Sequence, residues 1–220
     1  MMLKILVIDD RKNVREHICE LLETHLPKGA DVEVSGAFPL NDVKSYASYI
    51  REHDIAALLL DERLGEVGDP ITGRKSTYFG HDVVGHLRSR LPDFPVYAVT
   101  AFGADHELTQ KAADFEDIID RTDFQNKVQT YTSRILRAAA RFQDAMNSHL
   151  ENLSALTLKA AEGKLTSEEQ KTLEQTRSVL GLPFTSDAEL VASDLLANAR
   201  AVAFEAEALI NKLKSDVKKK

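Results

Sequence analysis

Carboxylic acids follow two apolar stretches of this sequence, each at the position where the stretch ends. Asp9 and Asp10 come directly after residues 3–8, and Asp61 comes directly after residues 55–60. Carboxylates that lie close together repel one another unless something positive joins them. A hard divalent cation such as Mg²⁺ fits such a cluster, because it prefers a few oxygen ligands and keeps several waters. If these three side chains meet, we expect a magnesium site.

A hydroxyl group and a guanidinium group stand at the ends of two further apolar stretches. Thr100 is the last residue of 95–100, and Arg121 comes directly after 117–120. A hydroxyl and a cation are suited to bind the oxygens of a phosphoryl group. Together with the three acids, they predict a site that handles both a metal ion and a phosphoryl group.

The elements that must position these side chains are strands that alternate with helices. We expect five strands, at residues 3–8, 31–38, 55–60, 95–100 and 117–120. Helical periodicity predicts helices at 13–26, at 41–51 with Asn41 as N-cap, at 81–91, at 107–113 and from Gln125 onward. Such alternation, with apolar strands, indicates a parallel sheet covered on both faces. Right-handed crossovers make this an α/β, doubly wound fold, in which ligands bind at the carboxyl ends of the strands.

Composition and charge narrow the classes of function. The chain has 220 residues, 43% of them hydrophobic, enough for one ordinary domain with an appendage or two small domains. Residues 1–124 hold 14 Lys and Arg against 23 Asp and Glu, and residues 125–220 hold 14 against 12. An acidic front half and a balanced back half argue against a nucleic-acid partner, which requires clustered positive charge. The lysines at 218–220 are interpreted as a solvated end.

Cysteine usage and hydropathy predict a cytoplasmic protein. Cys19 is the only cysteine, so neither an intrachain disulfide nor a thiolate metal cluster can form, which fits a reducing compartment. The first expected strand begins at Leu3, which leaves no room for a signal peptide. The longest apolar runs, of about six residues, are far too short to cross a membrane.

Three motifs resemble the receiver domain of bacterial two-component response regulators, the CheY-like family. They are ILVIDD, LLLDERL and VYAVTAF, and they stand in the family's order and intervals within about residues 1–130. The resemblance implies a flavodoxin-like, five-stranded parallel sheet of order 2-1-3-4-5 at residues 1–127. The alternative is a flavodoxin-like domain with incidental acids at its strand ends.

The resemblance also implies a role for each site residue. Asp61 is expected to be the phosphoacceptor, which attacks the phosphorus of a phosphohistidine carried by a sensor histidine kinase or a phosphotransfer protein. Asp9, Asp10 and Asp61 are expected to hold Mg²⁺, together with the backbone carbonyl of Arg63. Thr100 is expected to bond the acyl phosphate and to start the conformational switch.

The sequence departs from the family's pattern at several positions. Arg121 stands where the family has Lys, and Ile118 stands where an aromatic switch residue is expected. The loop at 64–79 is longer than usual by roughly ten residues, and we interpret it as a lid or docking loop or, equally, as an ordinary surface excursion. Glu62 and Asp120 lie near the site in sequence, and we expect both to be solvated surface acids.

Residues 128–220 predict helices and carry no DNA-recognition pattern. Apolar residues from Val128 to Leu156, with Leu150 among them, lie three, four or seven apart along one stripe, on a helix that Gly163 ends. Thr166 to Glu169 is a capping-box signature for a second helix that reaches about Leu180. A second such box at 186–189 predicts a third, coiled-coil-like helix from Val191 to Leu213. We expect a helical bundle or coiled coil, with a homodimer interface or an output-protein surface on these helices.

Three functions remain open at this point. The favoured one is a signalling switch that is phosphorylated on Asp61, controls protein–protein interaction and is not a turnover enzyme. The second is an interaction module whose altered Arg121 and Ile118 no longer relay phosphorylation. The third is a phosphotransfer protein that uses His149, which Glu151 follows closely, although His149 is interpreted as an ordinary helix residue.

Overall fold

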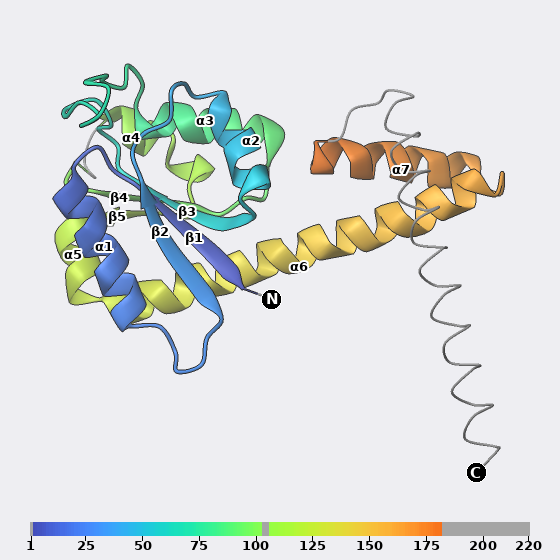
Figure 1. Ribbon diagram of the computed structural model, residues 1–220, viewed down its shortest axis with the longest axis horizontal. Helices are drawn as coiled ribbons and strands as arrows, with labels where there is room; N and C mark the ends of the chain where they lie inside the picture. Colours follow the sequence, from blue (N-terminus) through green and yellow to red (C-terminus); the bar gives the residue numbers. More distant parts are fainter. Residues whose placement is uncertain (1, 103–105, 182–220) are drawn as a thin grey trace, which may run out of the picture. The chain divides into compact units, whose positions relative to one another are not determined.

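One parallel sheet forms the centre of residues 1–145 (Figure 1). The computed structural model describes residues 2–102 and 106–181. The strands are β1 (Leu3–Ile8), β2 (Val32–Ala37), β3 (Ile55–Leu60), β4 (Val96–Thr100) and β5 (Asp117–Asp120). They are all parallel and lie in the order β2-β1-β3-β4-β5. The α/β, doubly wound fold and its strand order are therefore confirmed.

Helices cover both faces of this sheet, and alternate residues of each strand point to opposite faces. Leu58 and Leu60 of β3 belong to a core that contains side chains of α2 (Ser45–Glu52) and α3 (Gly80–Arg90). Leu59 belongs to a second core with α1 (Lys12–Thr24), α5 (Arg121–Asn126) and α6 (Val128–Ala161). In Figure 1, α2, α3 and α4 (His106–Gln110) lie on one side of the sheet, and α1 and α5 lie on the other. The 3₁₀ turn η1 (Ala112–Asp114) precedes β5.

Two helix starts differ from the sequence prediction, and in both cases an aspartate explains the difference. The helix predicted from Asn41 begins at Ser45, and the Asp42 side chain accepts from the amides of Lys44 and Ser45 at 2.6 and 3.2 Å. The helix predicted from Gln125 begins four residues earlier, as α5, because the exposed Asp120 side chain caps it. Such side-chain oxygens satisfy amides that have no partner within the first helical turn.

The second compact unit begins at Met146, and residues 146–181 are the part of it that the structure describes. Within it, α6 ends before Gly163, which has a φ of 67°, and α7 (Ser167–Leu180) begins with the predicted capping box of Thr166 and Glu169. Leu150 of the predicted apolar stripe is 52% exposed, and the role of this stripe as a bundle core or dimer interface stays a prediction. The predicted third helix and the box at 186–189 lie outside the described residues, and the boundary after residue 127 and the homodimer stay predictions.

None of the helices within residues 2–102 and 106–181 combines the length and the apolar character needed to cross a membrane. Even the longest of them, α6, carries charged side chains along its length.

Candidate functional site

Three buried carboxylates meet at the carboxyl ends of β1 and β3. The two strands are neighbours, with Ile8 opposite Leu60, so the residues that follow them are neighbours too. Asp9, Asp10 and Asp61 are each at most 2% exposed. One ligand oxygen from each lies within 4.8 Å of the others. The three acids therefore lie together, as their positions after the strands predicted. Their roles as metal ligands and as phosphoacceptor stay predictions.

Two guanidinium groups lie against these acids. Nη2 of Arg121 is 3.2 Å from Oδ2 of Asp9 and 3.2 Å from Oδ2 of Asp61, so it bridges the two carboxylates. Nη2 of Arg11 is 3.4 Å from Oδ2 of Asp61, and the Arg11 amide donates to Oδ1 of Asp9 at 2.8 Å. Sequence reasoning found Arg121 but missed Arg11, although its place directly after ILVIDD puts it at the same sheet edge.

Burial disfavours the ionised forms of two of these acids. It raises the pKa of Asp9 from 3.8 to about 6, and the charge of Asp61 raises it further, against the hydrogen bond and charge of Arg11 and the charge of Arg121. Burial likewise raises the pKa of Asp10, opposed mainly by hydrogen bonds from the backbone of Val67 and Glu66. A cation bound among these oxygens favours their ionised forms and reverses both shifts.

The donor set fits a hard divalent cation. Oδ1 of Asp10 is buried and has no hydrogen-bond partner among the described residues, while Oδ2 accepts from the Val67 amide at 2.6 Å. Oδ1 of Asp61 accepts from the Glu62 amide at 2.8 Å. Carboxylate oxygens with one free lone-pair site each are the ligands that Mg²⁺ takes in proteins. Asp9, Asp10 and Asp61 could each offer one oxygen to such an ion.

Thr100 and Arg63 lie at the same edge of the sheet. Leu60 pairs with Ala98, so Thr100 stands level with the residues that follow β3. Thr100 is fully buried, and its hydroxyl accepts from the Phe102 amide at 3.2 Å. The Arg63 guanidinium lies 3.6 Å from the centre of the Phe102 ring. The predicted roles of the Thr100 hydroxyl and of the Arg63 carbonyl stay predictions.

Glu62 is buried, so its interpretation as a solvated surface acid was wrong. It is 2% exposed, and its two carboxylate oxygens contact the Nδ1 and the amide nitrogen of His81 at 2.5 and 3.1 Å. The first turn of α3 covers it, since the Gly80 amide donates to the Glu62 carbonyl at 2.9 Å. A Cβ atom on Gly80 would lie 2.5 Å from the Asp61 carbonyl oxygen. A glycine at this position therefore lets α3 approach the carboxyl end of β3 closely.

Two residues that the sequence analysis considered for other roles, Ile118 at the aromatic switch position and His149 for phosphotransfer, are not part of the acidic cluster. Ile118 is partly buried on β5 and packs against the core that includes Phe115. His149 is partly buried on α6, in the second unit. Their predicted roles are not tested by these positions.

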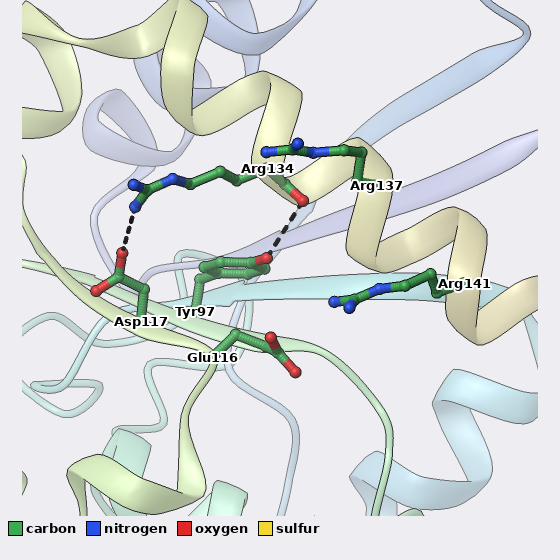
Figure 2. A pocket seen from close by; sticks show the side chains of 6 residues that line it. All are labelled: Tyr97, Glu116, Asp117, Arg134, Arg137 and Arg141. Atoms are coloured by element: carbon green, nitrogen blue, oxygen red, sulfur yellow. Dashed lines mark hydrogen bonds and ion pairs between the residues drawn. The ribbon is translucent and has the colours of Figure 1, made fainter.

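Two cavities flank the sheet at opposite ends. One, of about 750 Å³, adjoins the acidic site and is lined by Glu62, Arg63, Gly65, Glu66, Ser76, Thr77, Tyr78, Phe79, His106 and Glu107. The other, of about 310 Å³, lies at the start of β4 and β5 and is lined by Tyr97, Glu116, Asp117, Arg134, Arg137 and Arg141 (Figure 2). Because it opens at the amino ends of the strands, this second cavity is not part of the acidic site.

Comparison with known proteins gives no match in sequence and several in structure. No protein-family model matches the chain, and no curated protein has a similar sequence. A response regulator receiver domain protein from Clostridium thermocellum is 19% identical, with 64% of this chain and 97% of that chain covered and a TM-score of 0.43. The response regulator TrrA from Thermotoga maritima, solved in complex with Mg²⁺-BeF, is 18% identical, with 60% and 98% covered and a TM-score of 0.43.

The structure of NtrX from Brucella abortus is also similar, at 19% identity and a TM-score of 0.46, with 67% of this chain covered. The chain spans only 29% of that protein. The receiver domain of NtrX alone is 20% identical, with 60% of this chain and 98% of the domain covered and a TM-score of 0.43. At these identities and TM-scores the likeness assigns no function, and the fold rests on the sheet order itself.

Proposed function

We propose that this chain is a response-regulator-like signalling switch in which Asp61 accepts a phosphoryl group in the presence of Mg²⁺. The observation that carries the proposal is the buried cluster of Asp9, Asp10 and Asp61, whose ligand oxygens lie within 4.8 Å of one another. The unpartnered Oδ1 of Asp10 supports a cation there. The order of the motifs ILVIDD, LLLDERL and VYAVTAF, which resembles that of receiver domains, supports the acceptor role of Asp61.

In the proposed reaction, a carboxylate oxygen of Asp61 forms a bond to phosphorus as the bond between phosphorus and the donor's imidazole nitrogen breaks. The imidazole leaves with the electron pair of that bond and takes up a proton, and Asp61 becomes an acyl phosphate. A bound Mg²⁺ offsets the negative charge of the acceptor and of the phosphoryl oxygens. The Glu62 amide fixes the carboxylate at Oδ1, and Arg11 and Arg121 offer guanidinium donors to phosphoryl oxygens.

Arg121 keeps the cation that the family places here, but as a planar group that bridges two acids. Thr100 is the hydroxyl available to the acyl phosphate, and α6 is the element that could transmit its movement, because Ile135 and Ala139 pack against the sheet. We propose that the C-terminal helices bind an output protein or a second copy of the chain. The donor is a sensor histidine kinase or a phosphotransfer protein, and the chain is a switch and not a turnover enzyme.

A second candidate function is an interaction module that phosphorylation does not regulate. It is favoured by the pairing of Asp61 with two guanidinium groups, which balances the acceptor's charge without any metal ion. In this case the acidic site is a structural ion-pair network, and Asp61 has no chemical role.

Incubation of the full chain with acetyl phosphate and Mg²⁺ separates the candidates. We expect an acid-stable, base-labile adduct on Asp61, located by mass spectrometry, that is absent from Asp61→Asn and unchanged in His149→Ala. Absence of any adduct, with partner binding unchanged in Asp61→Asn, supports the interaction module. An adduct on His149 supports a phosphotransfer protein. Light scattering before and after phosphorylation tests dimerisation, which an unchanged mass would rule out as the output.

A further inference from the structure

The loop at 64–79 follows β3 and contacts one of the site's acids, Asp10, which follows the neighbouring strand β1. The Val67 amide donates to Oδ2 of Asp10 at 2.6 Å, across a separation of 57 residues in the chain. The other oxygen, Oδ1, is buried without a partner among the described residues. One oxygen of Asp10 is thus fixed by the loop, and the other remains available to the cluster with Asp9 and Asp61.

We propose that this loop is a positioning element for the cation, and that the Val67 amide orients Asp10 so that Oδ1 serves as the ligand oxygen. The inference rests on the proposed function, since it assumes that Asp9, Asp10 and Asp61 bind Mg²⁺. A group that bonds a metal ligand from outside the coordination sphere fixes its orientation, and its loss typically weakens metal binding by about 10- to 100-fold.

Internal bonds give the loop a defined shape. The Asp69 amide donates to the Arg74 carbonyl at 2.8 Å, and the Gly73 amide donates to the Asp69 carbonyl at 2.7 Å. Gly73 has a φ of 70°, and a Cβ atom on Gly68 would lie 2.8 Å from the Gly73 carbonyl oxygen. The loop closes on itself there, and Lys75 ties its second half to the Glu66 carbonyl at 2.8 Å. The Val67 amide is therefore presented to Asp10 from a closed loop.

Further bonds anchor the loop to the segment before α2. The Arg74 side chain donates to the Leu40 carbonyl at 3.0 Å, and the Tyr78 hydroxyl donates to the same oxygen at 2.7 Å. The Tyr78 hydroxyl also lies 3.0 Å from the hydroxyl of Tyr46, which is fully buried. Movement of the loop away from Asp10 requires these bonds to break, so the anchor holds the Val67 amide at the site.

The test is Mg²⁺ binding to the metal-free full chain, measured by isothermal titration calorimetry without any phosphodonor. Val67→Pro removes the amide hydrogen that Asp10 accepts, while the matched variant Val67→Ala keeps it. We expect Val67→Pro to bind Mg²⁺ about 10-fold more weakly than the wild-type chain, and Val67→Ala to bind within about twofold of it. Equal Mg²⁺ affinity in the two variants, with circular dichroism spectra like that of the wild type, overturns the proposal.

If Val67→Pro does not fold, Arg74→Ala decides the question, because Arg74 is exposed and its side chain ties the loop to Leu40. Lys44→Ala is the control, since it removes the same charge from an exposed position outside the loop. Mg²⁺ binding about threefold or more weaker in Arg74→Ala than in Lys44→Ala supports the positioning role, and binding equal within error overturns it. A wild-type chain that binds no Mg²⁺ refutes the proposed metal site itself, which distinguishes the two failures.

Discussion

Replacement of Asp9 by asparagine is expected to stabilise the metal-free protein at neutral pH. Asp9 is 1% exposed, and its pKa is raised from 3.8 to about 6, chiefly by burial. A tenfold change in proton affinity corresponds to about 1.4 kcal/mol, so the ionised Asp9 costs the folded state about 3 kcal/mol at pH 7. The contacts with Arg11 and Arg121 are already included in that pKa, and therefore we expect Asp9→Asn to gain between about 1 and 3 kcal/mol.

The pH dependence of this gain identifies its cause. A carboxyl group whose pKa is higher in the folded protein holds its proton more tightly there than in the unfolded chain. Its contribution therefore favours folding at low pH, and is lost as the pH rises from about 4 to about 6. Asparagine does not titrate. The variant should thus equal the wild type near pH 4 and exceed it in stability from about pH 6 upward.

Urea unfolding followed by tyrosine fluorescence is a suitable assay. The chain has no tryptophan, and its five tyrosines, at positions 46, 49, 78, 97 and 131, all lie in the first compact unit. The signal therefore reports the unit that contains Asp9, with EDTA present to exclude metal. Glu33→Gln, which neutralises an exposed carboxylate on β2, is the matched control and should change the unfolding free energy by less than about 0.5 kcal/mol.

Two results would refute the reasoning. A gain of the same size at pH 4 and pH 7.5 means that repacking, and not relief of a buried charge, stabilises the variant. A loss of stability at pH 7.5 means that the bridge from Arg121 outweighs burial of Asp9.

Added Mg²⁺ extends the test, because an ion at 100 times its dissociation constant stabilises a folded protein by about 2.7 kcal/mol. We expect the wild type to show this effect and Asp9→Asn to lose most of it.

Three further substitutions test other parts of the structure. Gly80→Ala places a Cβ atom 2.5 Å from the Asp61 carbonyl oxygen, so we expect the free energy of unfolding in urea to fall by at least about 1 kcal/mol and acetyl phosphate to label Asp61 more slowly. An unchanged free energy of unfolding would contradict the close approach. Thr166→Ala removes the N-cap of α7 and should cost that helix about 1 kcal/mol, seen as faster amide hydrogen exchange in α7. Arg134→Gln breaks an ion pair with Asp117 at 3.3 Å, drawn in Figure 2, but both partners are exposed, so a change above about 1 kcal/mol in unfolding free energy would be unexpected.

Local patterns were sufficient for the strands and for the three acids. A strand in the middle of a parallel sheet is buried on both faces, so IAALLL is apolar throughout, and the first acid after it marks where the chain leaves the core. Because all the strands of such a sheet point the same way, acids that follow different strands share one edge. Asp9, Asp10 and Asp61 could be expected to meet for that reason alone.

The surroundings of these acids could not be predicted in the same way. Exposure of the residue that follows a strand depends on which element covers it, and Glu62 is buried because the first turn of α3, with His81, folds over it. The contact between Val67 and Asp10 joins residues 57 positions apart, and it depends on how a long loop closes. No periodicity in the sequence encodes such a closure.

The alternation of strands and helices, the parallel sheet and the acids at its carboxyl edge can all be predicted from the sequence, because they follow from which residues are apolar and at what spacing. Which charges balance those acids depends on the packing of the folded chain. Arg11, Arg121 and the Val67 amide reach Asp61, Asp9 and Asp10 through side-chain and loop conformations. These conformations are set by packing between segments distant in the chain, and packing of that kind leaves no local signal in the order of residues.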